Sequence, residues 1–130
     1  MKSTILLIED NEQNCYLMTF LLESYKFSVV VANDGLTGIE LAEQIKPDLI
    51  LLDIQLPSMD GYDVAKSLRG IESLQMVPIV AVTSYAMVGD REKCLAAGCN
   101  GYIEKPINPE TFVKEILPFL PAATSPESAI

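Results

Sequence analysis

Short apolar runs alternate with longer segments of mixed polarity along the whole chain. The runs are rich in Ile, Val and Leu, and they occupy Ile5–Ile8, Val29–Ala32, Leu49–Leu52, Ile79–Val82 and, more weakly, Gly101–Ile103. Continuous apolar runs of this length and composition are typical of strands that are covered on both faces, as in parallel sheets. The pattern therefore predicts five buried strands.

The segments between these runs carry hydrophobic residues at helical spacing. Positions three and four apart, as on one face of a helix, occur in two sets: Cys15, Met18 and Leu22, and Leu36, Ile39 and Ala42. Asn11 and Asp34 are suitable N-cap residues, Gly98 suits the position just past a helix, and Pro118 should shorten or kink the last helix. Five helices alternating with five strands predict a doubly wound α/β sandwich with right-handed crossovers.

Composition limits the number of domains and the partners. A chain of 130 residues with 49% hydrophobic residues is expected to fold as one domain. We expect that domain over residues 1–121 and a disordered tail over residues 122–130, which are small and polar. The net charge of −9 argues against direct binding to nucleic acid or to an anionic membrane. The apolar runs are far shorter than the roughly 20 residues of a membrane span, so membrane insertion is not expected.

The residue inventory excludes several kinds of catalysis. The chain has no histidine, and its three cysteines, Cys15, Cys94 and Cys99, form no Cys-x-x-Cys pair. A zinc site and the Ser-His-Asp or Cys-His arrangements are therefore not expected. Free thiols suit a reducing cytoplasm, which is the location we expect. Any chemistry must come from carboxylates, hydroxyls, lysine and a metal ion.

Polar residues follow the apolar runs at the ends where parallel sheets bind ligands. These residues are Glu9 and Asp10 after the first run, Asp53 after the third, Thr83 and Ser84 after the fourth, and Glu104, Lys105 and Pro106 after the fifth. Neighbouring carboxylates repel one another, and the repulsion grows where water is scarce. Three clustered carboxylates offer hard oxygen ligands, and Mg²⁺ is the usual cation where a phosphate also binds.

Five stretches in this order give the chain a specific resemblance: "IED", "LLDIQLPSMDG", "VTS", "LAAG" and "GYIEKP". They resemble the receiver domain of a two-component response regulator, of the CheY-like single-domain type and more narrowly the DivK-like type, over residues 3 to 120. The resemblance implies a flavodoxin-like sheet of strand order 2-1-3-4-5 with five helices on two faces. It also implies a phosphorylation-dependent signalling switch rather than an enzyme, acting alone or within a longer protein.

The resemblance assigns a role to each residue of the set. Asp53 is the expected phosphoacceptor, and the phosphodonor is a histidine kinase or a histidine phosphotransfer protein, because this chain has no histidine. Mg²⁺ is expected to be held by Glu9, Asp10, Asp53 and the backbone carbonyl of Gln55. Thr83 and Lys105 are expected to bind the phosphoryl group.

The remaining roles concern the response to phosphorylation. Thr83 is expected to move toward the phosphoryl group, and Tyr102 to turn inward into the vacated space, which changes the surface offered to a downstream protein target. The bond before Pro106 is expected to be cis, and Ser84 supports the site. Gln55 and Tyr85 occupy positions that tune phosphoryl lifetime in the family, and a bulky Tyr85 is expected to shield the acyl phosphate from water.

Alternative functions differ from this prediction at identifiable residues. An aspartyl-phosphate phosphohydrolase of the haloacid-dehalogenase type requires Asp-x-Asp at the first strand, whereas this nucleophile lies on the third and Gln55 replaces the acid. A flavin carrier requires a hydroxyl-rich phosphate loop, where this chain has Glu9 and Asp10. A phosphorylation-independent interaction module would not need the complete acidic set together with Thr83 and Lys105.

Overall fold

The computed structural model describes residues 3–84 and 89–120. Strands and helices alternate strictly through these residues: β1 (Thr4–Ile8), α1 (Glu12–Ser24), β2 (Ser28–Ala32), α2 (Gly35–Ile45), β3 (Leu49–Asp53), α3 (Gly61–Arg69), the 3₁₀ helix η1 (Glu72–Leu74), β4 (Ile79–Thr83), α4 (Asp90–Ala96), β5 (Gly101–Glu104), α5 (Phe112–Ile116) and the 3₁₀ helix η2 (Leu117–Phe119). The predicted tail and Tyr85 lie outside the described residues. The described helices include none that is both long and apolar enough to cross a bilayer.

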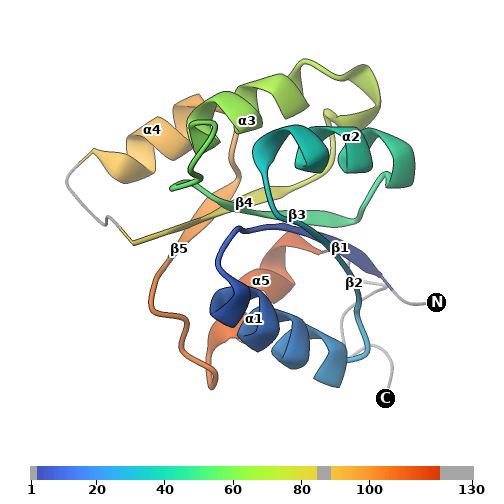
Figure 1. Ribbon diagram of the computed structural model, residues 1–130, viewed down its shortest axis with the longest axis vertical. Coiled ribbons are helices and arrows are strands. Elements are labelled where there is room, and N and C mark those ends of the chain that lie inside the picture. The colour runs from blue at the N-terminus through green and yellow to red at the C-terminus, as the bar shows by residue number, and fades with distance from the viewer. Residues whose placement is uncertain (1–2, 85–88, 121–130) are drawn as a thin grey trace.

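The five strands form one parallel sheet in the order β2-β1-β3-β4-β5, as expected. Helices α2, α3 and α4 cover one face, and α1 and α5 cover the other (Figure 1). Each strand is longer than its apolar run by one residue, because one flanking polar residue also belongs to each strand: Thr4, Ser28, Asp53, Thr83 and Glu104. These polar ends bring functional side chains into the ordered backbone of the sheet.

Alternate strand residues build two separate cores, as the period-two geometry of a strand requires. Leu6, Ile8, Ile50 and Leu52 pack toward α2 and α3. The residues between them in the same strands pack toward α1 and α5 with Met18, Leu22, Phe112 and Ile116: Ile5, Leu7, Leu49 and Leu51. Because both faces are buried, these strands appear in the sequence as continuous apolar runs.

The helix ends follow the predicted capping chemistry. The side chain of Asn11 accepts a hydrogen bond from the Asn14 amide, and Asp34 accepts one from Thr37. Gly98 has a φ of +107°, and the Cys99 amide donates to the Cys94 carbonyl at 3.0 Å, which is the pattern of a Schellman motif. This motif brings the two buried cysteines together at the end of α4.

Two features of the helices refine the sequence prediction. Leu36 was placed on the apolar face of α2, but its side chain is 67% exposed. The buried positions of α2 include Gly35 and Gly38, so close approach of the backbone to the sheet replaces side-chain packing there. α5 ends at Ile116 and continues as η2, which contains Pro118, as predicted for a proline at this position.

Arg69, at the end of α3, links several segments at the edge of the sheet opposite the strand ends that carry the acidic residues. Its guanidinium donates to the carbonyls of Gly98, Leu74 and Val77 at 2.8, 2.9 and 2.8 Å, and to Asn100 Oδ1 at 2.8 Å. Asn100 Oδ1 also accepts from the Ile79 amide at the start of β4. One planar group therefore joins α3, η1 and the turn between α4 and β5.

Candidate phosphoryl and metal site

The predicted site residues meet at the carboxyl ends of the strands. Glu9 follows β1, Asp53 ends β3, Thr83 ends β4 and Lys105 follows β5. Although polar, Glu9, Asp53 and Thr83 are 0%, 2% and 1% exposed. Buried polar groups require specific partners, and clustering of buried ionisable groups at a ligand-binding edge indicates a functional site.

Three carboxylates form one cluster at this edge. One carboxylate oxygen from each of Glu9, Asp10 and Asp53 lies within 4.8 Å of the others. Glu9 and Asp53 are buried, and Asp10 is exposed. Burial, reinforced by the neighbouring Asp53 carboxyl, raises the pKa of Glu9 from 4.5 to about 7. The ionised form of Glu9 is therefore disfavoured in the folded chain.

Lys105 supplies the positive charge between two of these carboxylates. Its Nζ lies 3.0 Å from Glu9 Oε1 and 3.3 Å from Asp53 Oδ2. Burial alone would lower the pKa of Lys105, but the attraction of the nearby Glu9 and Asp53 carboxylates outweighs it and raises that pKa. Lys105 thus lies at Asp53, but its shorter contact is with Glu9, and the sequence does not fix which carboxylate lies nearer.

The carboxylates are oriented by backbone amides. The Asn11 amide donates to Glu9 Oε2 at 3.1 Å, and the Gln55 amide donates to Asp53 Oδ1 at 3.0 Å. Glu9 Oε1 is buried and accepts no well-aligned hydrogen bond from the described residues, although Lys105 is close. An under-coordinated buried carboxylate oxygen within a set of hard oxygen ligands fits a small divalent cation such as Mg²⁺.

The side chain of Gln55 bridges to the end of β4. Its Nε2 donates to Thr83 Oγ1 at 2.8 Å, and its Oε1 accepts from the Ser84 amide at 2.9 Å. Asp53 pairs with Val82 in the β3–β4 ladder, so Thr83 and Ser84 lie immediately beyond the position of Asp53 on the adjacent strand. The sequence singled out Gln55, but it did not predict this bridge, which spans two separate loops.

The β5 side carries the remaining predicted residues. Tyr102 is partly buried against the α2–α4 core, and its hydroxyl donates to Glu104 Oε1 at 3.3 Å. The Lys105–Pro106 peptide bond is cis, as the resemblance implied. The Lys105 amide donates to the Thr83 carbonyl at 2.8 Å, which ties the lysine's backbone to β4.

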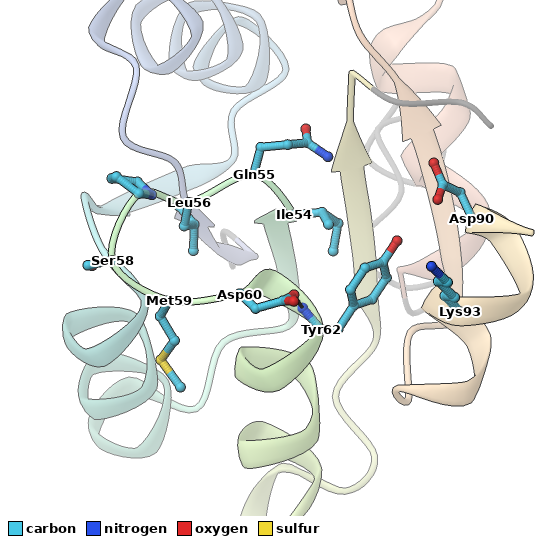
Figure 2. A pocket seen from close by; sticks show the side chains of 10 residues that line it. Ile54, Gln55, Leu56, Ser58, Met59, Asp60, Tyr62, Asp90 and Lys93 are labelled. Atoms are coloured by element: carbon cyan, nitrogen blue, oxygen red, sulfur yellow. Dashed lines mark hydrogen bonds between the residues drawn. The ribbon is translucent and has the colours of Figure 1, made fainter.

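A pocket of about 590 Å³ lies beside the site, between the segment that follows β3 and helices α3 and α4. Figure 2 shows Tyr62, Asp90 and Lys93 along one side of it, with the Gln55 side chain at the rim and its carboxamide directed toward the end of β4. Burial raises the pKa of Tyr62 to about 12, so this hydroxyl stays protonated. Because its carboxamide bonds to Thr83 and Ser84, Gln55 faces the Asp53 side of this segment rather than the pocket interior.

Comparison with known proteins identifies the same family as the sequence. The sequence model of one protein family, the response regulator receiver domain, matches residues 5–117 of this chain. The polar-differentiation response regulator DivK of Brucella ovis (strain ATCC 25840 / 63/290 / NCTC 10512) is 40% identical over 120 residues, which cover 92% of this chain and 98% of that protein.

Two solved structures of receiver domains are similar to this chain in fold and sequence. The receiver domain of sensor histidine kinase PA1611 from Pseudomonas aeruginosa PAO1, crystallised with a magnesium ion coordinated in its active site cleft, is 36% identical, with a TM-score of 0.84 and coverage of 92% of this chain and 98% of that one. The receiver domain of the Saccharomyces cerevisiae regulator Ssk1, solved with the histidine phosphotransfer protein Ypd1, is 30% identical, with a TM-score of 0.83 and coverage of 91% and 88%.

Proposed function

Because this chain belongs to the response regulator receiver family, we propose that Asp53 accepts a phosphoryl group from a phosphohistidine of a partner protein, with Mg²⁺, and thereby switches a protein-binding surface. The observation that carries this proposal is the buried set of Asp53, Glu9 and Lys105, with Lys105 Nζ 3.0 and 3.3 Å from the two carboxylates. A purely structural sheet end would not retain two buried carboxylates so close together.

The transfer requires little covalent chemistry from the chain. An Asp53 carboxylate oxygen forms a bond to phosphorus while the bond from phosphorus to the donor imidazole breaks, and the electron pair leaves with that nitrogen. The Gln55 amide holds Asp53 Oδ1, which orients the carboxylate toward the opening. When bound, Mg²⁺ supplies positive charge that neutralises both nucleophile and phosphoryl oxygens. Its proposed ligands are Glu9, Asp10, Asp53 and the Gln55 carbonyl.

Lys105 and Thr83 complete the proposed phosphoryl site. Lys105 already lies at Asp53, and a compact ammonium on a flexible stem can follow the added charge. The hydroxyl of Thr83 ends the strand next to Asp53. Its movement toward the phosphoryl group would open space for Tyr102, which now contacts Glu104 at the surface of β5. The switch would change the face formed by α4, β5 and α5.

The partners follow from the same chemistry. The phosphodonor is a histidine kinase or a histidine phosphotransfer protein, the class to which Ypd1 belongs in the solved Ssk1 complex. The output is contact with a downstream protein target in the cytoplasm, and it involves no direct binding to nucleic acid. The chain promotes its own phosphorylation and dephosphorylation and otherwise acts as a switch rather than as an enzyme.

Intact mass after incubation with acetyl phosphate tests this proposal. One added phosphoryl group is expected with Mg²⁺, and none is expected with EDTA or in Asp53→Asn. An adduct that persists in Asp53→Asn would place the acceptor elsewhere. No adduct under any condition would favour a phosphorylation-independent interaction module. Release of inorganic phosphate from phosphomonoesters would instead indicate a phosphohydrolase.

A further inference from the structure

The carboxamide of Gln55 makes two hydrogen bonds to residues at the end of β4, next to Asp53. Its Nε2 donates to Thr83 Oγ1 at 2.8 Å, and its Oε1 accepts from the Ser84 amide at 2.9 Å. The backbone amide of the same residue donates to Asp53 Oδ1 at 3.0 Å. Gln55 therefore binds Asp53 at the end of β3 through one hydrogen bond and the end of β4 through two.

A phosphoryl group on Asp53 would change the demand for hydrogen bonds at this point. It adds three strong acceptor oxygens beside Thr83 and Ser84. The Ser84 amide has one proton, which Gln55 Oε1 now accepts, so that oxygen and the phosphoryl group compete for the same donor. A shift of Thr83 toward Asp53 would also lengthen its bond to Gln55 Nε2. Both bonds thus belong to the unphosphorylated arrangement.

We propose that Gln55 is a latch that holds Thr83 and Ser84 in the resting arrangement and must release them before they bind the phosphoryl group. This inference rests on the proposed function and adds a positioning residue to it. A latch that is present only in the resting state stabilises that state and lowers the apparent affinity for whatever favours the active state. Gln55 is partly exposed, so its carboxamide can bond to water after release.

The latch makes a prediction opposite in sign to that of an ordinary supporting contact. Removing a residue that supports the phosphoryl site weakens binding, whereas removing a latch tightens it. Gln55→Met keeps the length of the side chain and the backbone carbonyl but removes both hydrogen-bonding ends. Because each bond contributes modestly in net terms, we expect roughly three- to tenfold tighter binding of a phosphoryl analogue.

The experiment is a calorimetric titration of beryllium fluoride, which mimics an acyl phosphate, at saturating Mg²⁺. It compares the wild-type chain, Gln55→Met and, as a matched control, Gln44→Met, whose side chain is exposed on α2. Urea unfolding without ligand accompanies each titration. The latch predicts tighter binding in Gln55→Met together with unchanged or lower stability, and wild-type affinity in Gln44→Met.

Equal or weaker binding in Gln55→Met, while the wild-type chain binds, would overturn the latch and leave the proposed function standing. An equal gain in Gln44→Met would also overturn it, because the effect would then not come from the bridge. Absence of Mg²⁺-dependent binding in the wild-type chain, together with no mass adduct from acetyl phosphate, would overturn both proposals. If Gln55→Met were too unstable to titrate, Gln55→Ala serves the same comparison.

Discussion

Replacing Glu9 with glutamine should stabilise the metal-free protein. Glu9 is fully buried, and its carboxylate belongs to a cluster with Asp53 and Asp10. Glutamine has nearly the same shape but no charge, so Glu9→Gln removes one of the crowded negative charges. Lys105 loses its closer partner but keeps Asp53 at 3.3 Å.

The pKa of Glu9 sets the upper limit of this effect. The pKa is about 7 in the folded chain and 4.5 for the unperturbed group. One pKa unit corresponds to about 1.4 kcal/mol, so ionised Glu9 is disfavoured by folding by about 3 kcal/mol at high pH. This figure already includes the attraction of Lys105, which lowers the pKa of Glu9. We expect Glu9→Gln to raise the free energy of unfolding by about 1–3 kcal/mol at pH 8.

The pH dependence has a definite sign. A carboxyl whose pKa is raised by folding binds more protons in the folded state than in the unfolded state. Its contribution therefore lowers the free energy of unfolding as pH rises. The destabilisation from Glu9 is absent below about pH 4.5 and complete above about pH 7. Urea unfolding in EDTA, followed by far-ultraviolet circular dichroism, should therefore show a larger gain for Glu9→Gln at pH 8 than at pH 5.

Controls separate this effect from a general loss of negative charge. Glu43→Gln removes an exposed carboxylate from α2 and should change stability by less than about 0.5 kcal/mol. Added Mg²⁺ should stabilise the wild-type chain more than Glu9→Gln, because a ligand stabilises the state that binds it. Equal or lower stability of Glu9→Gln in EDTA at pH 8, or a gain that does not depend on pH, would refute the reasoning.

Three further substitutions test the scaffold by urea unfolding. Arg69→Met should lower the free energy of unfolding by roughly 3–5 kcal/mol, because several backbone carbonyls lose a charged donor. Arg69→Lys should recover only part of this lost stability. A loss below about 1 kcal/mol in Arg69→Met would contradict this role. Gly61→Ala should be destabilising and slow phosphoryl uptake from acetyl phosphate, because an added Cβ would clash with the backbone of Ile54. Wild-type stability and rate would contradict this. Asn11→Ala should cost about 1 kcal/mol through loss of the cap on the Asn14 amide, with no loss expected if that bond is unimportant in solution.

Much of the fold and most of the site could be predicted from local patterns. Continuous apolar runs located the strands because both faces of each central strand are covered. Polar residues at the ends of those runs then located Glu9, Asp53 and Thr83, since parallel strands bring their carboxyl ends to one edge. The caps at Asn11 and Asp34 followed from local chemistry alone.

Other features depend on tertiary distances that no local pattern encodes. The bridge from Gln55 to Thr83 and Ser84 joins loops that are far apart in the sequence, and its geometry follows from the packing of β3 against β4. The shorter contact of Lys105 with Glu9 has the same origin. Leu36 was misplaced because helical spacing cannot show that glycines bring α2 close to the sheet.

The distribution of the site over separate strands has a consequence for hydrogen exchange. Glu9 follows β1 and Asp53 ends β3 in the middle of the sheet, whereas Lys105 follows the edge strand β5. Partial opening of β5 alone would remove Lys105 from the two carboxylates, so a ligand held by all three opposes even local unfolding. Amide protection gained on ligand binding should therefore extend along β5 as well as the central strands. A ligand bound at the site therefore couples the local stability of β5 to that of the central strands.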